Sequence, residues 1–329
     1  MANMTRRSLV AGLGGTMASL ALAACGNSST DGASGSTDAA GKSFKIGVLQ
    51  LVEHDALDAA NAGFVTAIQD SGLDVKIDQQ NAQGDQSACQ TIATKLVNDG
   101  NDLILAIATP SVEAVAGATD QIPIVGTAVT DFEASGLVAS NEKPGGNITG
   151  TSDLTPVEEQ IALIPKFLPD AKTVGILYCT AESNSDIQVK MAEDACKANG
   201  LTPERYSVAS SNEIQQVVES AVNKVDVLYA PTDNVIAAGF ATVAMVANEK
   251  GIPTVCGEKG MIDAGGLVTI SIDYLELGKR AGEMALRILT EGANPADMPI
   301  EHLDFEECEL ITSEETAKKL GIDLSPLSN

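Results

Sequence analysis

The chain has 329 residues, of which 44% are hydrophobic and 20% are charged. This composition is typical of a globular protein, and the length accommodates two domains of about 150 residues each. Asp and Glu outnumber Lys and Arg by 45 to 20, which gives a net charge of −25. Nucleic acids and anionic membranes attract basic patches, so this charge argues against both as partners. Trp is absent and His occurs only twice, which disfavours histidine-based metal sites and catalytic triads.

The first 24 residues have the pattern of an export signal. Arg6 and Arg7 precede a small and apolar stretch from Leu9 to Ala24, which is too short and too rich in Gly and Ala for a stable spanning helix. The stretch ends in Leu22-Ala23-Ala24-Cys25, which resembles a bacterial lipobox. We therefore expect residues 1–24 to be a lipoprotein signal peptide and Cys25 to carry the lipid that anchors the protein outside the cytoplasm. A secretory signal with an incidental cysteine is the alternative, and the two arginines leave general and twin-arginine export both open.

Residues 25–43 predict a flexible tether. Residues 27–42 are rich in Ser, Gly, Asp and Ala and contain no large apolar side chain, so they cannot bury enough surface to fold. The remaining cysteines show no C-x-x-C spacing, which disfavours a zinc or redox site. Disulfides and buried free thiols both remain open for Cys89, Cys179, Cys196, Cys256 and Cys308.

From Phe44 onward the chain alternates short apolar runs with amphipathic stretches. Near-continuous apolar runs at 45–51 and 103–108 are typical of buried parallel strands, and 74–78 alternates like a strand nearer the sheet edge. Apolar residues at helical spacing occupy 57–68 and 88–97. This half of the chain therefore predicts a βαβαβ unit.

The same plan repeats in the second half of the chain. Gly47 in the first expected strand and Gly175 in its counterpart are 128 residues apart. We expect strand, helix, strand, helix and strand at 174–178, 186–199, 202–208, 213–223 and 225–230. The repeat predicts an α/β protein of two doubly wound parallel-sheet lobes.

Further elements follow the second unit, with strands expected at 267–272 and 303–311 and a helix at 278–290. The simplest distribution returns this helix to the first lobe and the last strand to the second. We therefore expect lobe one to comprise 44–153 plus 273–299 and lobe two 154–272 plus 300–329. Three crossings of the chain would then form a hinge that contains 151–154 and 271–274, in a protein that acts as a monomer.

In open α/β sheets the ligand binds at the carboxyl ends of the strands. Four turns that follow expected strands are rich in hydroxyl, amide and carboxylate groups: 53–55, 109–111, 180–185 and 232–234. If the two lobes face each other across a hinge, these turns converge on one cleft.

The residue types in these turns suit a zwitterionic ligand. Ser111 and Ser185 lie where helices begin, and the free N–H groups and positive dipole of a helix start favour a carboxylate. Glu182, Asp233 and Asp273 are acidic candidates for binding an ammonium group. Ser, Thr and Asp after strands are also ordinary helix caps, so only the joint pattern indicates a site.

A family resemblance rests on several short motifs in a fixed order. They are Ala108-Thr109-Pro110-Ser111, Val129-Thr130-Asp131, Gly146-Asn147-Ile148-Thr149-Gly150-Thr151-Ser152-Asp153, Gly175-Ile176-Leu177-Tyr178, Glu182-Ser183-Asn184-Ser185, Pro231-Thr232-Asp233-Asn234 and Ile272-Asp273-Tyr274. Across nearly all of 44–329 the chain resembles the substrate-binding lipoproteins of ABC importers related to the tryptophan-, tyrosine- and phenylalanine-binding group.

The resemblance implies a type I periplasmic-binding-protein fold that closes on an amino acid, usually an aromatic one, and a separate permease and ATPase. It implies no cofactor. Together with the strand-end argument it gives the following ligand-binding candidates: Glu53, His54, Thr109, Ser111, Thr130, Asp131, Tyr178, Glu182, Asn184, Ser185, Thr232, Asp233, Asn234, Asp273 and Tyr274.

Two positions depart from the family pattern. Phe132 follows Thr130-Asp131 where a Pro is common, and Cys179 follows Tyr178 where an Asn is common. Of the ten aromatic residues, we expect Phe132, Tyr178 and Tyr274 to line the ligand.

Four other functions are alternatives to an amino-acid receptor. A binding protein of the same fold for a nucleoside or an oxo-acid remains open, as does a lipoprotein that only senses its ligand. An enzyme is disfavoured because the sequence has no nucleophile elbow, phosphate loop or metal-ligand spacing. A transcriptional repressor of the same fold would need a basic DNA-binding segment where this chain has an export signal.

Overall fold

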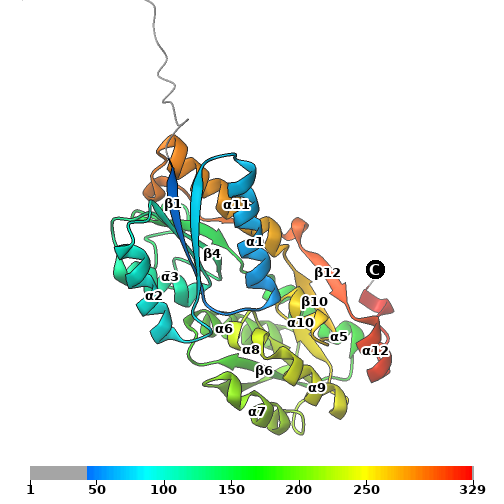
Figure 1. Cartoon of the computed structure of the whole chain (residues 1–329). Coiled ribbons are helices and arrows are strands. Elements are labelled where there is room, and N and C mark those ends of the chain that lie inside the picture. Colours follow the sequence, from blue (N-terminus) through cyan, green and yellow to red (C-terminus); the bar gives the residue numbers. More distant parts are fainter. Residues whose placement is uncertain (1–42, 328–329) are drawn as a thin grey trace, which may run out of the picture. The chain divides into compact units, whose positions relative to one another are not determined.

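The computed structural model of the chain describes residues 43–327. The expected signal peptide, Cys25 and all of the tether except its last residue therefore lie outside the described residues. The described residues form two α/β lobes, each built on a six-stranded sheet with helices on both faces (Figure 1). The expected fold class, two doubly wound lobes, is confirmed.

Lobe one is the part of the chain that packs around the first sheet, whose strands run parallel in the order β11-β5-β4-β3-β1-β2. The strands are β1 (Phe44–Gln50), β2 (Val75–Asn81), β3 (Leu103–Ile107), β4 (Ile124–Val129), β5 (Ile148–Ser152) and β11 (Glu301–His302). The helices and turns are α1 (Asp55–Asp70), α2 (Gln86–Asn98), α3 (Thr109–Ala118), α11 (Tyr274–Leu286), the π-helical turn η2 (Arg287–Glu291) and the 3₁₀ turn η3 (Pro295–Asp297).

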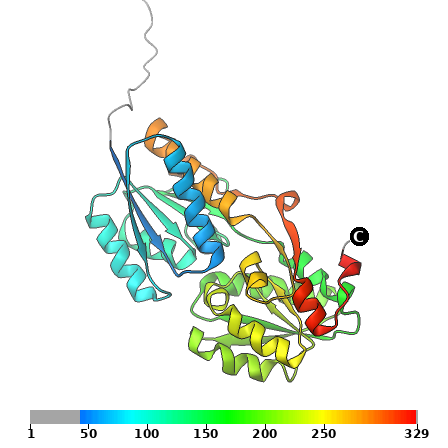
Figure 2. The same cartoon turned by 45° about the vertical axis from the view of Figure 1, so that its right-hand side comes forward.

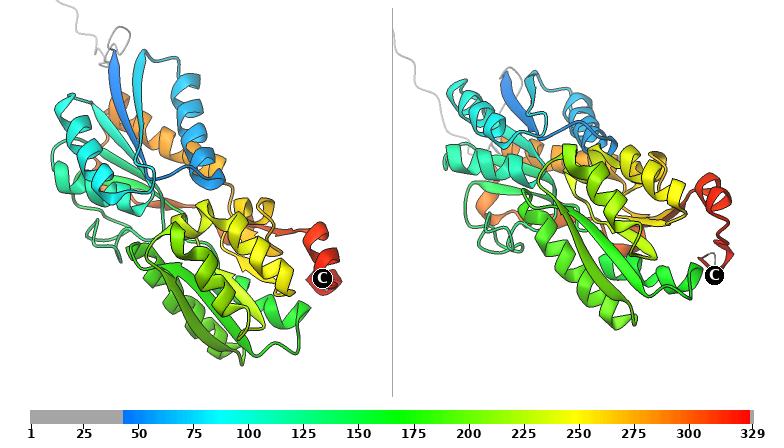
Figure 3. Two further views of the ribbon diagram at one scale, coloured as in Figure 1. Left: turned by 60° about the horizontal axis from the view of Figure 1, so that its bottom comes forward. Right: turned by 90° about the horizontal axis from the view of Figure 1, so that it is seen from below.

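Lobe two packs around the second sheet, in the order β12-β10-β9-β8-β6-β7, in which only β12 runs antiparallel to its neighbour. The strands are β6 (Thr173–Cys179), β7 (Thr202–Val208), β8 (Val227–Ala230), β9 (Thr254–Cys256), β10 (Val268–Ser271) and β12 (Glu309–Thr312). The helices are α4 (Val157–Ala162), α5 (Ile164–Phe167), α6 (Ser183–Ala198), α7 (Ile214–Ala221), α8 (Asn234–Ala238), α9 (Phe240–Lys250), α10 (Lys259–Asp263) and α12 (Glu314–Leu320), with 3₁₀ turns η1 (Ser211–Glu213), η4 (Phe305–Glu307) and η5 (Ser325–Leu327). Figure 3 shows α12 (red) on this lobe.

The central strands explain why apolar runs predicted the sheets. All five residues of β3 are fully buried, because helices cover both faces of the sheet. Gly72 and Gly200 follow α1 and α6 with φ angles of +70° and +73°, a conformation that glycine adopts without steric cost.

One expected element is wrong. The chain does not form a single strand over 303–311, because Asp304 and Glu307 form a capping box that turns the backbone into η4. The two residues of β11, which were expected in lobe two, pair with β5 of the first sheet instead.

Helix α11 returns to lobe one and packs tightly on α1, as Figure 2 shows for the orange and blue helices. Glycines make this approach feasible. A Cβ atom on Gly278 would clash with the carbonyl oxygen of Ala60, and one on Gly63 would clash with the carbonyl oxygen of Leu275. The helix that carries Tyr274 is therefore fixed rigidly to lobe one.

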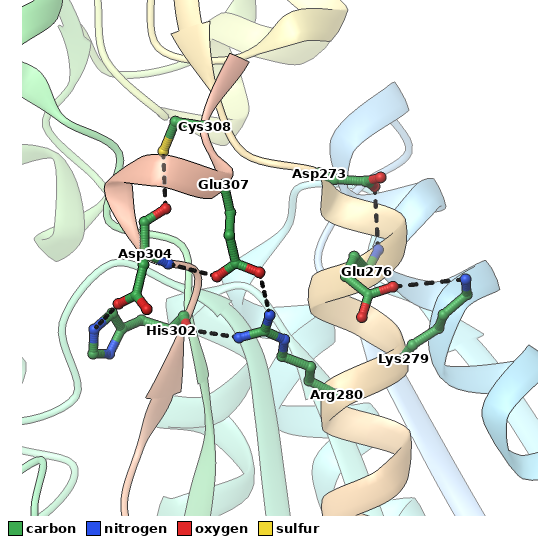
Figure 4. A network of polar contacts seen from close by, with 8 residues as sticks. All are labelled: Asp273, Glu276, Lys279, Arg280, His302, Asp304, Glu307 and Cys308. Carbon is green, nitrogen blue, oxygen red and sulfur yellow. Dashed lines mark hydrogen bonds and ion pairs between the residues drawn. The ribbon is translucent and has the colours of Figure 1, made fainter.

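The chain crosses between the lobes three times, after β5, after β10 and after β11. The third crossing is tied to α11 by Arg280 (Figure 4). Its guanidinium donates to the carbonyl oxygen of His302 at 2.9 Å and to Oε1 of Glu307 at 2.5 Å. Glu307 in turn accepts the backbone N–H of Asp304 at 2.8 Å. These bonds hold the crossing against the helix of lobe one.

The cysteines of residues 43–327 are all free thiols, which decides between the two alternatives left open by the sequence. Four are buried and Cys308 is half-buried. Within the same residues, no helix combines the length and the apolar character that crossing a membrane requires.

Candidate functional site

A cavity lies between the two lobes, at the carboxyl ends of their strands. Lobe one contributes His54, Ala56, Leu57, Ala128, Thr130, Asp153 and Tyr274, and lobe two contributes Asn184, Thr232, Asp233, Asn234, Ala237 and Glu258. A polar cavity at the ends of parallel strands is where α/β proteins bind small molecules.

Two buried carboxylates organise the wall that lobe two contributes. Asp233 is fully buried and accepts hydrogen bonds from the Cys179 N–H, from Ser185 Oγ at 2.7 Å and from the Ile236 N–H at 2.9 Å. Glu182 accepts from Asn234 Nδ2 at 2.5 Å and from the Val235 N–H at 2.9 Å. These bonds hold the turns after β6 and β8 together.

Burial dominates the electrostatics of this wall. It raises the pKa of Asp233, and it also raises the pKa of Glu182, where the nearby Asp233 charge acts in the same direction. Burial raises the pKa of Glu258 to about 7, although the carboxylate caps α10 and accepts the N–H groups of Gly260 and Met261. No Lys or Arg is among the residues that line the cavity.

Hydrogen bonds cross between the lobes beside the cavity. Gln188 Nε2 of lobe two donates to Thr130 Oγ1 of lobe one at 3.2 Å. His54 and Asn234 meet at 3.2 Å between Nε2 and Oδ1. Because the Nδ2 group of Asn234 donates to Glu182, its Oδ1 accepts, so Nε2 carries the hydrogen of the His54 ring. Burial lowers the pKa of His54, which favours this neutral ring.

Two further bonds join the lobes away from the hinge. Ser183 Oγ donates to Glu113 Oε1 at 2.7 Å, and Gln86 Nε2 donates to the carbonyl oxygen of Ala181 at 2.5 Å. The lobes are therefore in contact on both sides of the cavity, and a ligand held there would be largely enclosed.

Three polar atoms that line the cavity have no hydrogen-bond partner within the described part of the chain. They are Oδ1 of Asp153, Oδ1 of Asn184 and Nδ1 of His54. Asp153 is 5% exposed and Asn184 is 2% exposed. Because buried polar atoms are almost always paired, these three are the atoms best placed to meet a ligand.

The structure brings seven of the fifteen candidate residues to the cavity wall: His54, Thr130, Asn184, Thr232, Asp233, Asn234 and Tyr274. Two more, Glu182 and Ser185, lie behind the wall and hold it by hydrogen bonds. Ser185 and Ser111 are the third residues of α6 and α3, and neither side chain caps its helix. Thr109 and Ser111 are buried in α3 and are not among the lining residues.

The remaining four candidates lie elsewhere. Glu53 is exposed on the surface. Asp131 accepts the N–H groups of its own turn at 133 and 134. Asp273 is exposed and caps α11 through the N–H groups of 275 and 276. Tyr178 packs into the core of lobe two.

Of the three aromatic residues expected to line the ligand, only Tyr274 lines the cavity. Phe132 is fully buried in the core of lobe one, where its ring lies against Gly126. The candidate set omits Asp153 and Glu258. Both follow strands, β5 and β9, so the strand-end argument could have found them.

Comparison with known proteins gives consistent matches. The model of the family described as ABC transporter substrate binding protein matches residues 45–326. A tyrosine-binding protein of Clostridioides difficile (strain R20291) is 45% identical over 291 residues, which cover 87% of this chain and 83% of that protein.

Two solved structures bear on the arrangement of the lobes. The ABC domain from Streptococcus pneumoniae in complex with L-Trp is 38% identical, with a TM-score of 0.84 and coverage of 87% of this chain and 98% of that one. The ligand-free, open structure of a substrate-binding protein with adhesive properties from Clostridium difficile is 43% identical, with a TM-score of 0.65 and coverage of 85% and 95%. The structure therefore matches the L-Trp complex better than the open protein, although the open protein is more similar in sequence.

Proposed function

Since the chain belongs to the family of ABC transporter substrate-binding proteins, we propose that it binds an aromatic amino acid and delivers it to a membrane permease that an ATPase drives. The family has a binding role and not a catalytic one. Substrate-binding proteins of ABC importers are extracytoplasmic, and we place this protein there as a monomer.

The observation that carries the proposal is the cavity between the lobes. Its polar atoms come from both lobes, so a ligand would contact both and favour their closure. Its apolar lining includes Ala56, Ala128 and Ala237, whose side chains are small. The named ligands of two relatives, tyrosine and L-Trp, support an aromatic amino acid.

We propose that the ligand contacts the seven candidate residues that line the cavity. Asp233 and Glu182 would act by holding the turns after β6 and β8 in place. The hinge is proposed at the crossings after β5 and β10, where the sequence placed it.

The test is calorimetry on protein freed of residual ligand, with L-tyrosine, L-tryptophan and L-phenylalanine as probes. We expect at least one of them to bind, and the bound protein to have a smaller radius of gyration in solution scattering, because the lobes close. Mass spectrometry of the ligand released from freshly purified protein identifies the natural one. A nucleoside or an oxo-acid as the released ligand, with no binding of the three amino acids, would contradict the proposal.

Transport and sensing differ in the partner that reads the closed protein. A permease and an ATPase gene beside the gene for this chain would support transport, and a receptor gene in their place would support a sensor.

We also propose that residues 1–24 are a lipoprotein signal, that Cys25 carries the lipid and that 25–43 form the tether. The mutation Cys25→Ala removes the thiol that directly follows the apolar stretch, so we expect it to release the protein from the membrane pellet after detergent-free lysis. Cys308→Ala, which changes a half-buried thiol of the folded part, serves as the control and should stay in the pellet. Retention of Cys25→Ala at the wild-type level would contradict the lipid anchor.

A further inference from the structure

The carboxylate of Asp153 is held in place from one side only. Its Oδ2 atom accepts the hydroxyl of Tyr274 at 2.9 Å, while Oδ1 lines the cavity and has no partner within residues 43–327. Burial raises the pKa of this carboxylate to about 6, so most of it is ionised at neutral pH. A buried, ionised oxygen without a partner is unfavourable unless a positively charged donor meets it.

Asn184 presents a second acceptor from the opposite lobe. Its Nδ2 group donates to Glu182 Oε2 at 3.3 Å, which fixes the orientation of the amide. The Oδ1 atom of Asn184 is consequently available as an acceptor. Asn184 lines the cavity, and its Oδ1 has no hydrogen-bond partner among the described residues. Two acceptors from opposite lobes, one of them charged, match a cationic donor with several N–H groups.

The other acidic side chains at or near the cavity already accept hydrogen bonds from the protein itself. Both oxygens of Asp233 accept hydrogen bonds from groups of lobe two. Both oxygens of Glu258 accept N–H groups of α10. Asp273 is outside the cavity wall, as the cap of α11. Asp153 is thus the acid best able to receive a ligand.

We propose that Oδ1 of Asp153 and Oδ1 of Asn184 together bind the ammonium group of the amino acid, a role that rests on the function proposed above. Asp153 belongs to lobe one, where Tyr274 on the rigid α1–α11 pair orients it, and Asn184 belongs to lobe two. The ammonium group therefore joins the lobes. A ligand without this group gains less from closure and shifts the lobes less toward the closed arrangement.

The first experiment needs no variant. Calorimetry on the wild-type protein compares each of L-tyrosine, L-tryptophan and L-phenylalanine with the propanoate of the same side chain, which lacks only the ammonium group. We expect the amino acid that binds to do so on the order of 100-fold more tightly than its propanoate, because a buried charge loses its partner.

The second experiment uses Asp153→Asn, which keeps the shape of the side chain and removes its charge. We expect a loss on the order of 100-fold in affinity for the amino acid and a much smaller change for the propanoate. Asp273→Asn is the matched control, because Asn caps a helix as well as Asp and this position lies outside the cavity wall.

The outcomes separate the two proposals. If the wild-type protein binds none of the three amino acids, the proposed function fails and the ammonium site fails with it. If it binds one of them as tightly as its propanoate, or if Asp153→Asn binds the amino acid like wild type, the ammonium site alone is wrong. Loss of affinity in Asp273→Asn but not in Asp153→Asn would transfer the role to Asp273.

Discussion

Ala237→Leu is expected to reduce affinity for the aromatic amino acid on the order of 100-fold. Ala237 lies on α8 and lines the cavity between the lobes. A leucine at this position places three further carbon atoms in space that the ligand side chain would occupy. The ligand then fits only if the lobes close less completely, which weakens the contacts that both lobes make with it.

The neighbouring Ala238 offers a matched control. It lies on the same helix but is exposed, and it is not among the lining residues. Ala238→Leu should therefore bind the ligand like wild type, and calorimetry on the three proteins checks this. Thermal unfolding without ligand checks that all three proteins are folded. Equal affinity of Ala237→Leu and wild type would place the ligand side chain elsewhere.

The alternation of apolar runs and helical stripes was enough to predict the two lobes. Parallel strands buried on both faces have a recognisable composition, which is why the pattern identifies them. The return of the late helix to lobe one was expected instead as the simplest distribution of the remaining elements, and α11 does pack on α1. Because the parallel strands are buried on both faces, their sequence does not indicate which side chains face the ligand. Tyr178 and its neighbours Leu177 and Cys179 are all buried, on opposite faces of β6, so alternation does not distinguish core from site.

The two acids near the hinge show why sequence reasoning could not choose between them. Asp273 precedes a helix that begins at the next residue, so the N–H groups of α11 occupy its carboxylate. Asp153 also follows a strand, but the chain continues without a helix until Val157. No helix start is close enough to occupy Asp153, and its Oδ1 remains available to the cavity. Whether such a carboxylate caps a helix or stays available therefore depends on where the next helix begins, to within one residue.

If the charge of Asp153 serves to bind the ligand, it should reduce the stability of the unliganded protein. The variant Asp153→Asn measures this loss of stability. The pKa of Asp153 rises from 3.8 to about 6 on folding, so the folded protein binds the proton more tightly than the unfolded chain. Wild type therefore loses stability as the pH rises from about 4 through about 6. The variant cannot ionise at this position. The difference in free energy of unfolding, variant minus wild type, should therefore increase by up to about 3 kcal/mol over this pH range.

Urea unfolding of both ligand-free proteins between pH 4 and 7 tests the expectation. Taking the difference between variant and wild type removes, to first order, the contributions of the other titratable groups around the cavity, which are His54, Glu182, Asp233, Glu258 and Tyr274. Asp273→Asn should show no comparable widening, because that side chain is exposed. A difference between Asp153→Asn and wild type that stays constant from pH 4 to 7 would mean that Asp153 bears no unfavourable charge in the empty protein. A widening difference, together with loss of amino-acid affinity in the same variant, would mean that one carboxylate lowers the stability of the empty protein and provides the affinity of the loaded one.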